Sequence, residues 1–155
     1  GGHFFDKLEE RRRLNYYETM ARELDIEHYV KFTGSIPNTL LPYYINISDV
    51  LILPSLAEGF PRVLVEAMAC GKPVIATNLP GIQEIVTHKE TGILVNPDNI
   101  EDLANAILFL YRNKKKSKDM GEKARKTVIE KYNLEVVVNK WIQTFQEAIQ
   151  MVLHK

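Results

Sequence analysis

Short runs of apolar residues, each followed by a turn and a helical pattern, most strongly constrain the fold of this 155-residue chain. Residues 50–53 read VLIL, residues 74–77 read VIAT and residues 92–95 read GILV. Near-continuous apolar strands are typical of parallel sheets, because helices cover such strands on both faces. We therefore predict an α/β fold with a Rossmann-like, doubly wound parallel sheet and C-terminal helices.

The remaining segments supply the other expected elements. A charged amphipathic pattern predicts a helix over residues 6–24, and YVKF predicts a short strand over residues 29–32. Further helices are expected over residues 39–47, 61–70, 81–86, 100–111, 117–131 and 134–153. A doubly wound domain normally begins with a strand, whereas this chain begins with Gly1, Gly2 and a helix. We therefore expect the sheet to lack its first strand–helix unit, within one domain over residues 1–155.

Composition narrows the class of protein. Hydrophobic residues make up 45% and charged residues 26% of the chain, as in soluble globular proteins. Lys plus Arg and Asp plus Glu both number 20, so bulk charge predicts neither nucleic acid nor an anionic membrane as a partner. The local excess of lysines over residues 114–118 predicts a solvated loop between helices, with a basic patch facing membrane lipid as the alternative.

Several features absent from the sequence limit the compartment and the chemistry. Cys70 is the single cysteine, which excludes an intramolecular disulfide and predicts a reducing compartment. No apolar run approaches the roughly 18–20 residues that span a bilayer. The chain carries neither the Gly-x-Gly-x-x-Gly dinucleotide fingerprint nor a Walker loop, and its four histidines are scattered. We therefore expect no dinucleotide cofactor and no bound metal.

The stretch AEGFPRVLVEA, residues 57–67, carries the candidate site. If Pro61 opens a helix, the N–H groups of Arg62, Val63 and Leu64 are free, and with the helix dipole they form an anion site suited to a phosphate. Glu58 lies in the turn just before this helix, and Gly59 gives that turn its backbone freedom. The local chemistry therefore predicts a site for an anionic ligand.

A second carboxylate, Glu66, lies on the same predicted helix. Because this helix is apolar apart from Arg62 and Glu66, we expect it to be buried, and a buried carboxylate needs a partner. That partner is either Arg62, four residues earlier on the same face, or the adjacent hydroxyls of a ligand such as a ribose. The spacing does not choose between these two alternatives.

Residues 54–86, PSLAEGFPRVLVEAMACGKPVIATNLPGIQEIV, resemble the donor-binding half of retaining glycosyltransferases of family 4, the group 1 enzymes of GT-B architecture. The family signature is a Glu, seven residues, a second Glu, and then a segment like AMACGKPVIA. VKFTGSIP, TGILVNPDNIEDLANAI and EKYNLEVVVNKW also resemble family segments. The resemblance covers nearly the whole chain.

The resemblance implies roles for individual residues. Glu66 would bind the ribose hydroxyls of a nucleotide-diphosphate sugar, and Glu58 would hold the donor sugar as the catalytic carboxylate. Gly59, Phe60, Pro61, Arg62, Val63 and Leu64 would contact sugar and diphosphate, while Gly34, Ser35 and Ile36 would border the nucleobase. Gly81 and Glu84 match a second family loop. The family needs no metal.

The resemblance also implies what lies outside this sequence. The acceptor would be held by an N-terminal domain of the same protein, and an Arg and a Lys that neutralise the diphosphate belong to the strand–helix unit this chain lacks. We therefore expect a retaining, hexosyl-type transferase that is inactive as the isolated chain, in the cytoplasm or at the inner face of a membrane with peripheral association. The alternatives are a sugar epimerase or phosphorylase of related architecture, or a non-catalytic module for nucleotide-sugar binding or assembly.

Overall fold

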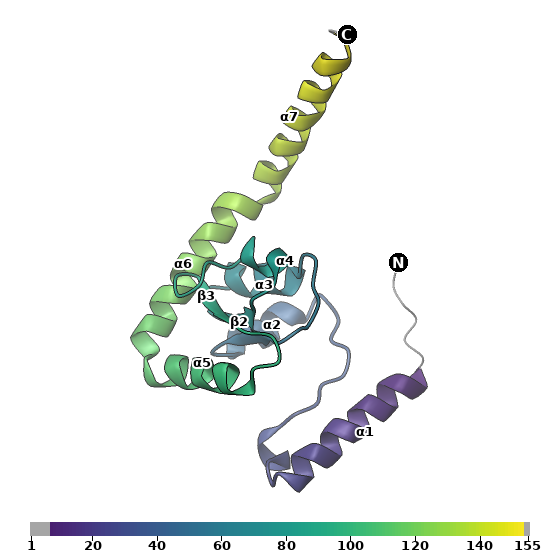
Figure 1. Ribbon diagram of the computed structural model, residues 1–155, viewed down its shortest axis with the longest axis vertical. Coiled ribbons are helices and arrows are strands. Elements are labelled where there is room, and N and C mark those ends of the chain that lie inside the picture. Colours follow the sequence, from purple (N-terminus) through teal and green to yellow (C-terminus); the bar gives the residue numbers. More distant parts are fainter. Residues whose placement is uncertain (1–6, 154–155) are drawn as a thin grey trace. The chain divides into compact units, whose positions relative to one another are not determined.

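The computed structural model describes residues 7–153 and divides into two compact units, one ending at Pro37 and one beginning at Asn38. The first unit contains helix α1 (Lys7–Glu23) and the short 3-10 helix η1 (Glu27–Tyr29), drawn in purple in Figure 1. Between the two helices, Asp25 adopts a left-handed backbone with φ of 53°. The N–H of Ile26 donates to the carbonyl of Ala21 over 2.9 Å. The expected helix over 6–24 is therefore confirmed over its described residues.

The strand expected over residues 29–32 is wrong. Tyr29 closes η1, and residues 30–33 carry no regular secondary structure. Val30 does adopt an extended backbone, with φ of −113° and ψ of 127°. A strand is defined by hydrogen bonds to a neighbour, and this segment has no strand partner within its own unit.

The second unit is built around the predicted parallel sheet. Its strands β1 (Leu51–Leu53), β2 (Val74–Thr77) and β3 (Gly92–Val95) lie in the order β1-β2-β3. Leu53 pairs with Ala76, and Thr77 pairs with Val95, so the carboxyl ends of the strands meet at one edge. The α/β class and the positions of all three strands are confirmed.

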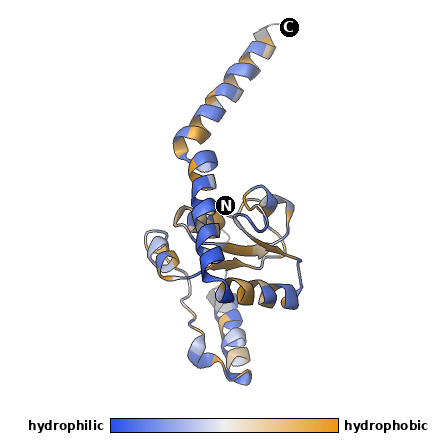
Figure 2. Cartoon of the chain, turned by 90° about the vertical axis from the view of Figure 1, so that its left-hand side faces the viewer, coloured by the Kyte–Doolittle hydropathy of each residue, from blue (hydrophilic) through white to orange (hydrophobic). Residues whose placement is uncertain are grey.

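Helices cover both faces of this sheet. They are α2 (Leu41–Ile47), α3 (Arg62–Ala69), α4 (Pro80–Gln83), α5 (Ile100–Arg112) and α6 (Lys114–Tyr132). Helix α7 (Leu134–Leu153) packs against α6 and extends away from the sheet (Figure 1). Val74 and Ala76 pack in one core cluster with Leu64 of α3, whereas Ile75 packs in the other with Leu110 of α5. Figure 1 shows α5 on the opposite side of the strands from α3 and α4, and Figure 2 shows the strands as the hydrophobic centre. Alternate residues of one strand thus serve two cores.

Strand β1 is less covered than the sequence predicts. Ile52 is 37% exposed, whereas its partner on β2, Ile75, is fully buried. β1 lies at the end of the described sheet and has a neighbour on one side only, so its outward face packs against fewer side chains. The expectation of full burial therefore holds for β2 and fails for β1.

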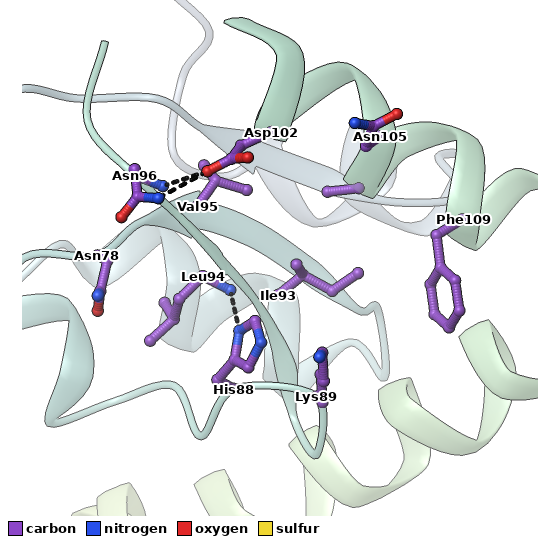
Figure 3. A pocket seen from close by; sticks show the side chains of 11 residues that line it. Asn78, His88, Lys89, Ile93, Leu94, Val95, Asn96, Asp102, Asn105 and Phe109 are labelled. Atoms are coloured by element: carbon purple, nitrogen blue, oxygen red, sulfur yellow. Dashed lines mark hydrogen bonds between the residues drawn. The ribbon is translucent and has the colours of Figure 1, made fainter. Parts of the chain in front are cut away.

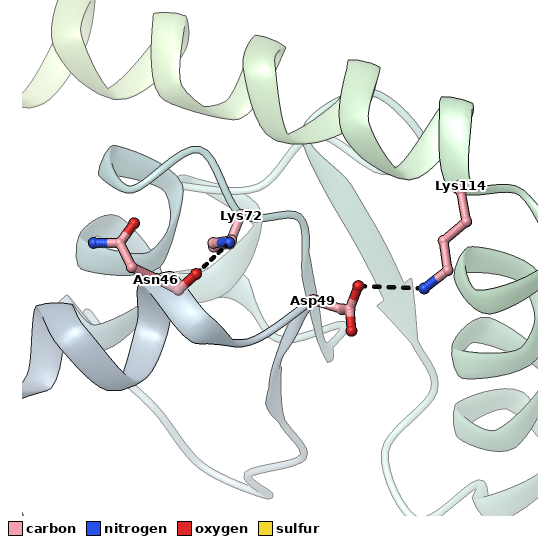
Figure 4. Close-up of polar contacts among 4 residues, drawn as sticks. All are labelled: Asn46, Asp49, Lys72 and Lys114. Atoms are coloured by element: carbon pink, nitrogen blue, oxygen red, sulfur yellow. Dashed lines mark hydrogen bonds and ion pairs between the residues drawn. The ribbon is translucent and has the colours of Figure 1, made fainter.

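The lysines of residues 114–118 belong to a helix, and the predicted loop is wrong at this point. Helix α6 begins at Lys114, because Ser117 already donates its N–H to the carbonyl of Asn113 over 2.9 Å. Lys114 Nζ lies 3.2 Å from Asp49 Oδ1, the contact drawn in Figure 4 beside the Lys72 to Asn46 hydrogen bond. Across residues 7–153, no helix is long and apolar enough to cross a membrane.

Candidate functional site

The two loops that follow β1 and β2 meet at the carboxyl edge of the sheet. The first loop runs over residues 54–61, and the second runs over residues 78–79 and leads into α4, which contains Gly81. The parallel strands that precede the two loops are neighbours. A Cβ on Gly81 would overlap the carbonyl of Gly59, so only glycine allows this approach. Ligands of doubly wound folds bind outside this edge, which is where the sequence places its candidate residues.

Glu58 is held in position by hydrogen bonds from the protein. Ser55 Oγ donates to Glu58 Oε1 over 2.9 Å. The carbonyl of Ser55 in turn accepts from Thr77 Oγ1 over 2.5 Å. Thr77 lies at the end of β2 and is only 2% exposed. The half-buried carboxylate therefore has a defined partner before any ligand arrives.

The start of α3 offers a smaller anion site than the sequence predicts. Pro61 is the N-cap rather than the first helical residue, with ψ of 98°, and Arg62 begins the helix. The N–H of Leu64 is not free, because it donates to the Pro61 carbonyl over 3.1 Å. Within the described hydrogen bonds, the N–H groups of Arg62 and Val63 have no acceptor. These two remain as donors for an anion.

Glu66 is exposed, so the expectation of a buried carboxylate is wrong. Helix α3 is amphipathic: Leu64, Ala67 and Met68 are buried, whereas Arg62 and Glu66 lie on the solvent-facing side. In the part of the chain that the structure describes, no ion pair joins Arg62 to Glu66, and no side-chain hydrogen bond is made by Glu66. The first of the two alternatives for satisfying this carboxylate, an Arg62 partner, is therefore not realised.

Tyr132, which the sequence did not single out, connects the 54–61 loop and the C-terminal end of α4 to the end of α6. Its hydroxyl donates to the Glu84 carbonyl over 2.9 Å, and its ring centroid lies 5.7 Å from that of Phe60. Burial, followed by the charge of Glu84, raises the pKa of the Tyr132 hydroxyl above its usual range. The phenol therefore stays protonated and able to donate through neutral pH.

The predicted nucleobase-side residues lie in the first unit. Gly34 has a positive φ of 62°, a conformation that favours glycine, and both it and Ser35 are exposed. Ile36 is half-buried. The structure thus brings residues 58–64 together with Gly81 in the second unit. Gly34, Ser35 and Ile36 belong to the first unit.

A cavity of about 790 Å³ lies along β3; Asn78 lines it, but none of the predicted binding residues does. Figure 3 shows His88 Nδ1 accepting from the Leu94 N–H over 3.0 Å, and Asp102 accepting from the Asn96 side chain over 2.8 Å. These side chains satisfy polar groups at the outer edge of β3. Among residues 7–153, no group of three His, Cys, Asp or Glu side chains lies close enough to hold a metal. His3 and His154 lie outside the described residues.

Among the described residues, the loop after β1 and the helix α3 that follows it present one oriented carboxylate, one solvent-facing carboxylate and two backbone N–H groups without an acceptor. Carboxylates accept hydrogen bonds from hydroxyls, and the donors at the helix start favour a negative group. This combination fits a ligand that carries both hydroxyls and an anionic group.

Residues 9–127 match the sequence profile of the family Glycosyl transferases group 1, which is more than two thirds of the chain. The chain belongs to this family. An uncharacterized glycosyltransferase of Haemophilus influenzae is 37% identical over 126 residues, covering 80% of this chain and 35% of that protein. The chain thus spans about a third of the length of that relative.

The chain has the same fold as parts of several solved glycosyltransferase structures. HepE of Anabaena, solved in complex with UDP-glucose, is 27% identical with a TM-score of 0.82, over 93% of this chain and 38% of that one. A C-terminal domain of a group 1 protein from Francisella tularensis is 26% identical with a TM-score of 0.72, over 79% and 65%. The chain therefore has the Rossmann-like fold of the C-terminal domain in GT-B glycosyltransferases.

Proposed function

We propose that residues 1–155 form one domain that binds the nucleotide-diphosphate sugar donor of a retaining glycosyltransferase. The observation that carries this proposal is the pair of carboxylates flanking the start of α3, within a chain that belongs to the group 1 family. The complex of HepE with UDP-glucose supports a uridine nucleotide as the first donor to test.

Four of the candidate residues have a proposed contact with the donor. Glu66, exposed and without a side-chain partner among the described residues, accepts hydrogen bonds from the ribose hydroxyls. The N–H groups of Arg62 and Val63 bind the diphosphate, and the departing diphosphate is stabilised there during transfer. Glu58, oriented by Ser55, holds the donor sugar as the catalytic carboxylate.

The other predicted residues complete the proposed site. Gly59 and Phe60 lie between the two glutamates, and Gly34, Ser35 and Ile36 border the base. Transfer to an acceptor needs the N-terminal domain of the longer protein, so we expect the chain alone to bind donor and to transfer nothing. A reducing, cytoplasmic compartment stays the prediction drawn from Cys70.

Calorimetric titration of the chain with UDP, UDP-glucose and glucose tests the proposal. We expect UDP-glucose to bind more tightly than UDP, and glucose alone to show no measurable binding. Glu66→Gln should weaken both nucleotides by about tenfold, roughly the effect of losing hydrogen bonds to a charged group. Glu58→Gln should weaken UDP-glucose while leaving UDP unchanged.

Glu90→Gln, which removes an exposed carboxylate before β3, is the matched control and should bind as the unmodified chain does. Equal affinity of Glu66→Gln and the unmodified chain for UDP would contradict the ribose assignment. A chain that binds neither UDP nor UDP-glucose would contradict the donor-binding proposal as a whole.

A further inference from the structure

We propose that Thr77 is the positioning residue for Glu58, acting through Ser55 from the neighbouring strand. This inference rests on the proposed function, because it concerns the carboxylate that is assigned to the donor sugar. It adds two residues, Thr77 and Ser55, that the sequence pattern around the two glutamates does not single out.

The position of Ser55 explains why it needs support. The ladder between β1 and β2 ends at the pair Leu53–Ala76, so the backbone of Ser55 lies beyond the last strand pairing. Its carbonyl is held instead by the hydroxyl of Thr77, over 2.5 Å. A side chain thus provides one further hydrogen bond between the two strands after the backbone ladder has ended.

Thr77 is well suited to fix this carbonyl. Its backbone is itself in the ladder with Val95 of β3, and the next N–H, of Asn78, donates to the Val95 carbonyl over 2.8 Å. Its side chain is 2% exposed, and a β-branched side chain has few χ1 states. The hydroxyl therefore points at Ser55 from a rigid position.

The hydrogen bond from Thr77 acts on the Glu58 carboxylate through Ser55. Ser55 uses its carbonyl toward Thr77 and its hydroxyl toward Glu58 Oε1, over 2.9 Å. Releasing the carbonyl lets the Ser55 backbone turn, and the hydroxyl then loses its direction toward Glu58. Catalytic and binding groups depend on such supporting hydrogen bonds for their geometry.

The first measurement is the ratio of the Kd for UDP to the Kd for UDP-glucose. Thr77→Val keeps the shape of the side chain and removes the hydroxyl, and we expect it to lower this ratio about tenfold, as Ser55→Ala should. Thr77→Ser keeps the hydroxyl and should restore most of the ratio. Because the three residues act in one chain of contacts, Thr77→Val combined with Glu58→Gln should lose no more than Glu58→Gln alone.

A purely structural role for Thr77 predicts a different result. Thr77→Val would then lower the unfolding temperature while the ratio stayed at its original value, and that outcome would overturn the inference. If Glu58→Gln itself leaves the ratio unchanged, the assignment of Glu58 to the donor sugar is wrong instead.

A ligand-independent measurement decides the positioning role in either case. The crystal structure of Thr77→Val should show the Glu58 carboxylate displaced from Ser55 Oγ, with the rest of β2 unchanged. A carboxylate that keeps its hydrogen bond to Ser55 in this variant would show that Thr77 does not position it.

Discussion

Glu58 and Glu66 belong to one short motif, yet the structure supports them in opposite ways. Glu58 is half-buried, accepts a hydrogen bond from Ser55, and lies in a loop that contacts Thr77 of β2 and Gly81 of α4. Glu66 lies on the exposed side of α3, with no side-chain partner in the described part of the chain. The fold therefore orients the Glu58 carboxylate by a hydrogen bond and leaves the Glu66 carboxylate exposed to solvent.

This difference suggests a division of work within the proposed site. A preset carboxylate suits the reacting end of a ligand, because geometry there decides whether the bond is correctly placed. An exposed carboxylate loses water only when a ligand arrives, so it contributes mainly to affinity. Variants that disturb the loop around Glu58 should therefore affect folding, whereas a change at Glu66 should affect binding alone.

The largest expected effect on the side of Glu58 is that of Gly81→Ala. The new methyl group would overlap the Gly59 carbonyl, and the 54–61 loop and α4 would have to move apart. We expect the free energy of unfolding to fall by about 2–3 kcal/mol, as for other overpacked sites, in urea denaturation followed by circular dichroism.

Gly59→Ala is the control for this prediction, since a Cβ there has nothing within 4 Å. It should change the free energy of unfolding by less than about 1 kcal/mol. Equal destabilisation by the two variants would mean that the close approach of Gly81 to the Gly59 carbonyl does not stabilise the Glu58 loop.

The sequence predicted the parts of the fold that depend on local patterns. Residues 74–77 and 92–95 form strands as expected, since a continuous apolar run identifies a strand covered on both faces. The helix expected over residues 61–70 also ends close to its predicted limit, because Gly71, with φ of 72°, and the 3.0 Å bond from the Lys72 N–H to the Ala67 carbonyl form the usual helix end.

The sequence failed where distant residues decide the outcome. The Thr77 to Ser55 bond joins residues 22 apart, and the Tyr132 to Glu84 bond joins residues 48 apart, so no local spacing marks either. Ser55 alone had a local signal, because it precedes Glu58 by three residues. The exposure of Glu66 was missed because an apolar helix was taken to be buried all round, although only one of its faces meets the core.

Tyr132→Phe tests the hydrogen bond between Tyr132 and the end of α4, with a smaller expected effect. It removes the hydrogen bond to the Glu84 carbonyl and keeps the ring contact with Phe60. We expect a loss of about 1 kcal/mol in the free energy of unfolding, the usual value for one neutral hydrogen bond. Tyr132→Ala removes both contacts and should cost more; if the two variants unfold alike, the ring of Tyr132 does not support the loop.

The same tyrosine predicts a pH dependence at high pH. Burial and the Glu84 charge raise its pKa in the folded state above the value in the unfolded chain, so the folded state holds this proton more tightly. The contribution to stability is complete below pH 10 and is lost as the pH rises from 10 through the folded pKa. Lysines titrate there too, so the informative quantity is the difference between the original chain and Tyr132→Phe, which should shrink above pH 10.

Glu66→Ala should have the smallest effect on the free energy of unfolding, and comparing it with Glu58→Ala contrasts the two carboxylates directly. An exposed side chain without a partner among the described residues has no contact to lose, so we expect a change within about 0.5 kcal/mol in the free energy of unfolding. Glu58→Ala, in contrast, leaves the Ser55 hydroxyl without its acceptor and should cost about 1 kcal/mol. Measured by urea denaturation without ligand, equal values for the two alanine variants would remove the distinction between a carboxylate that the fold positions and one that it leaves for a ligand.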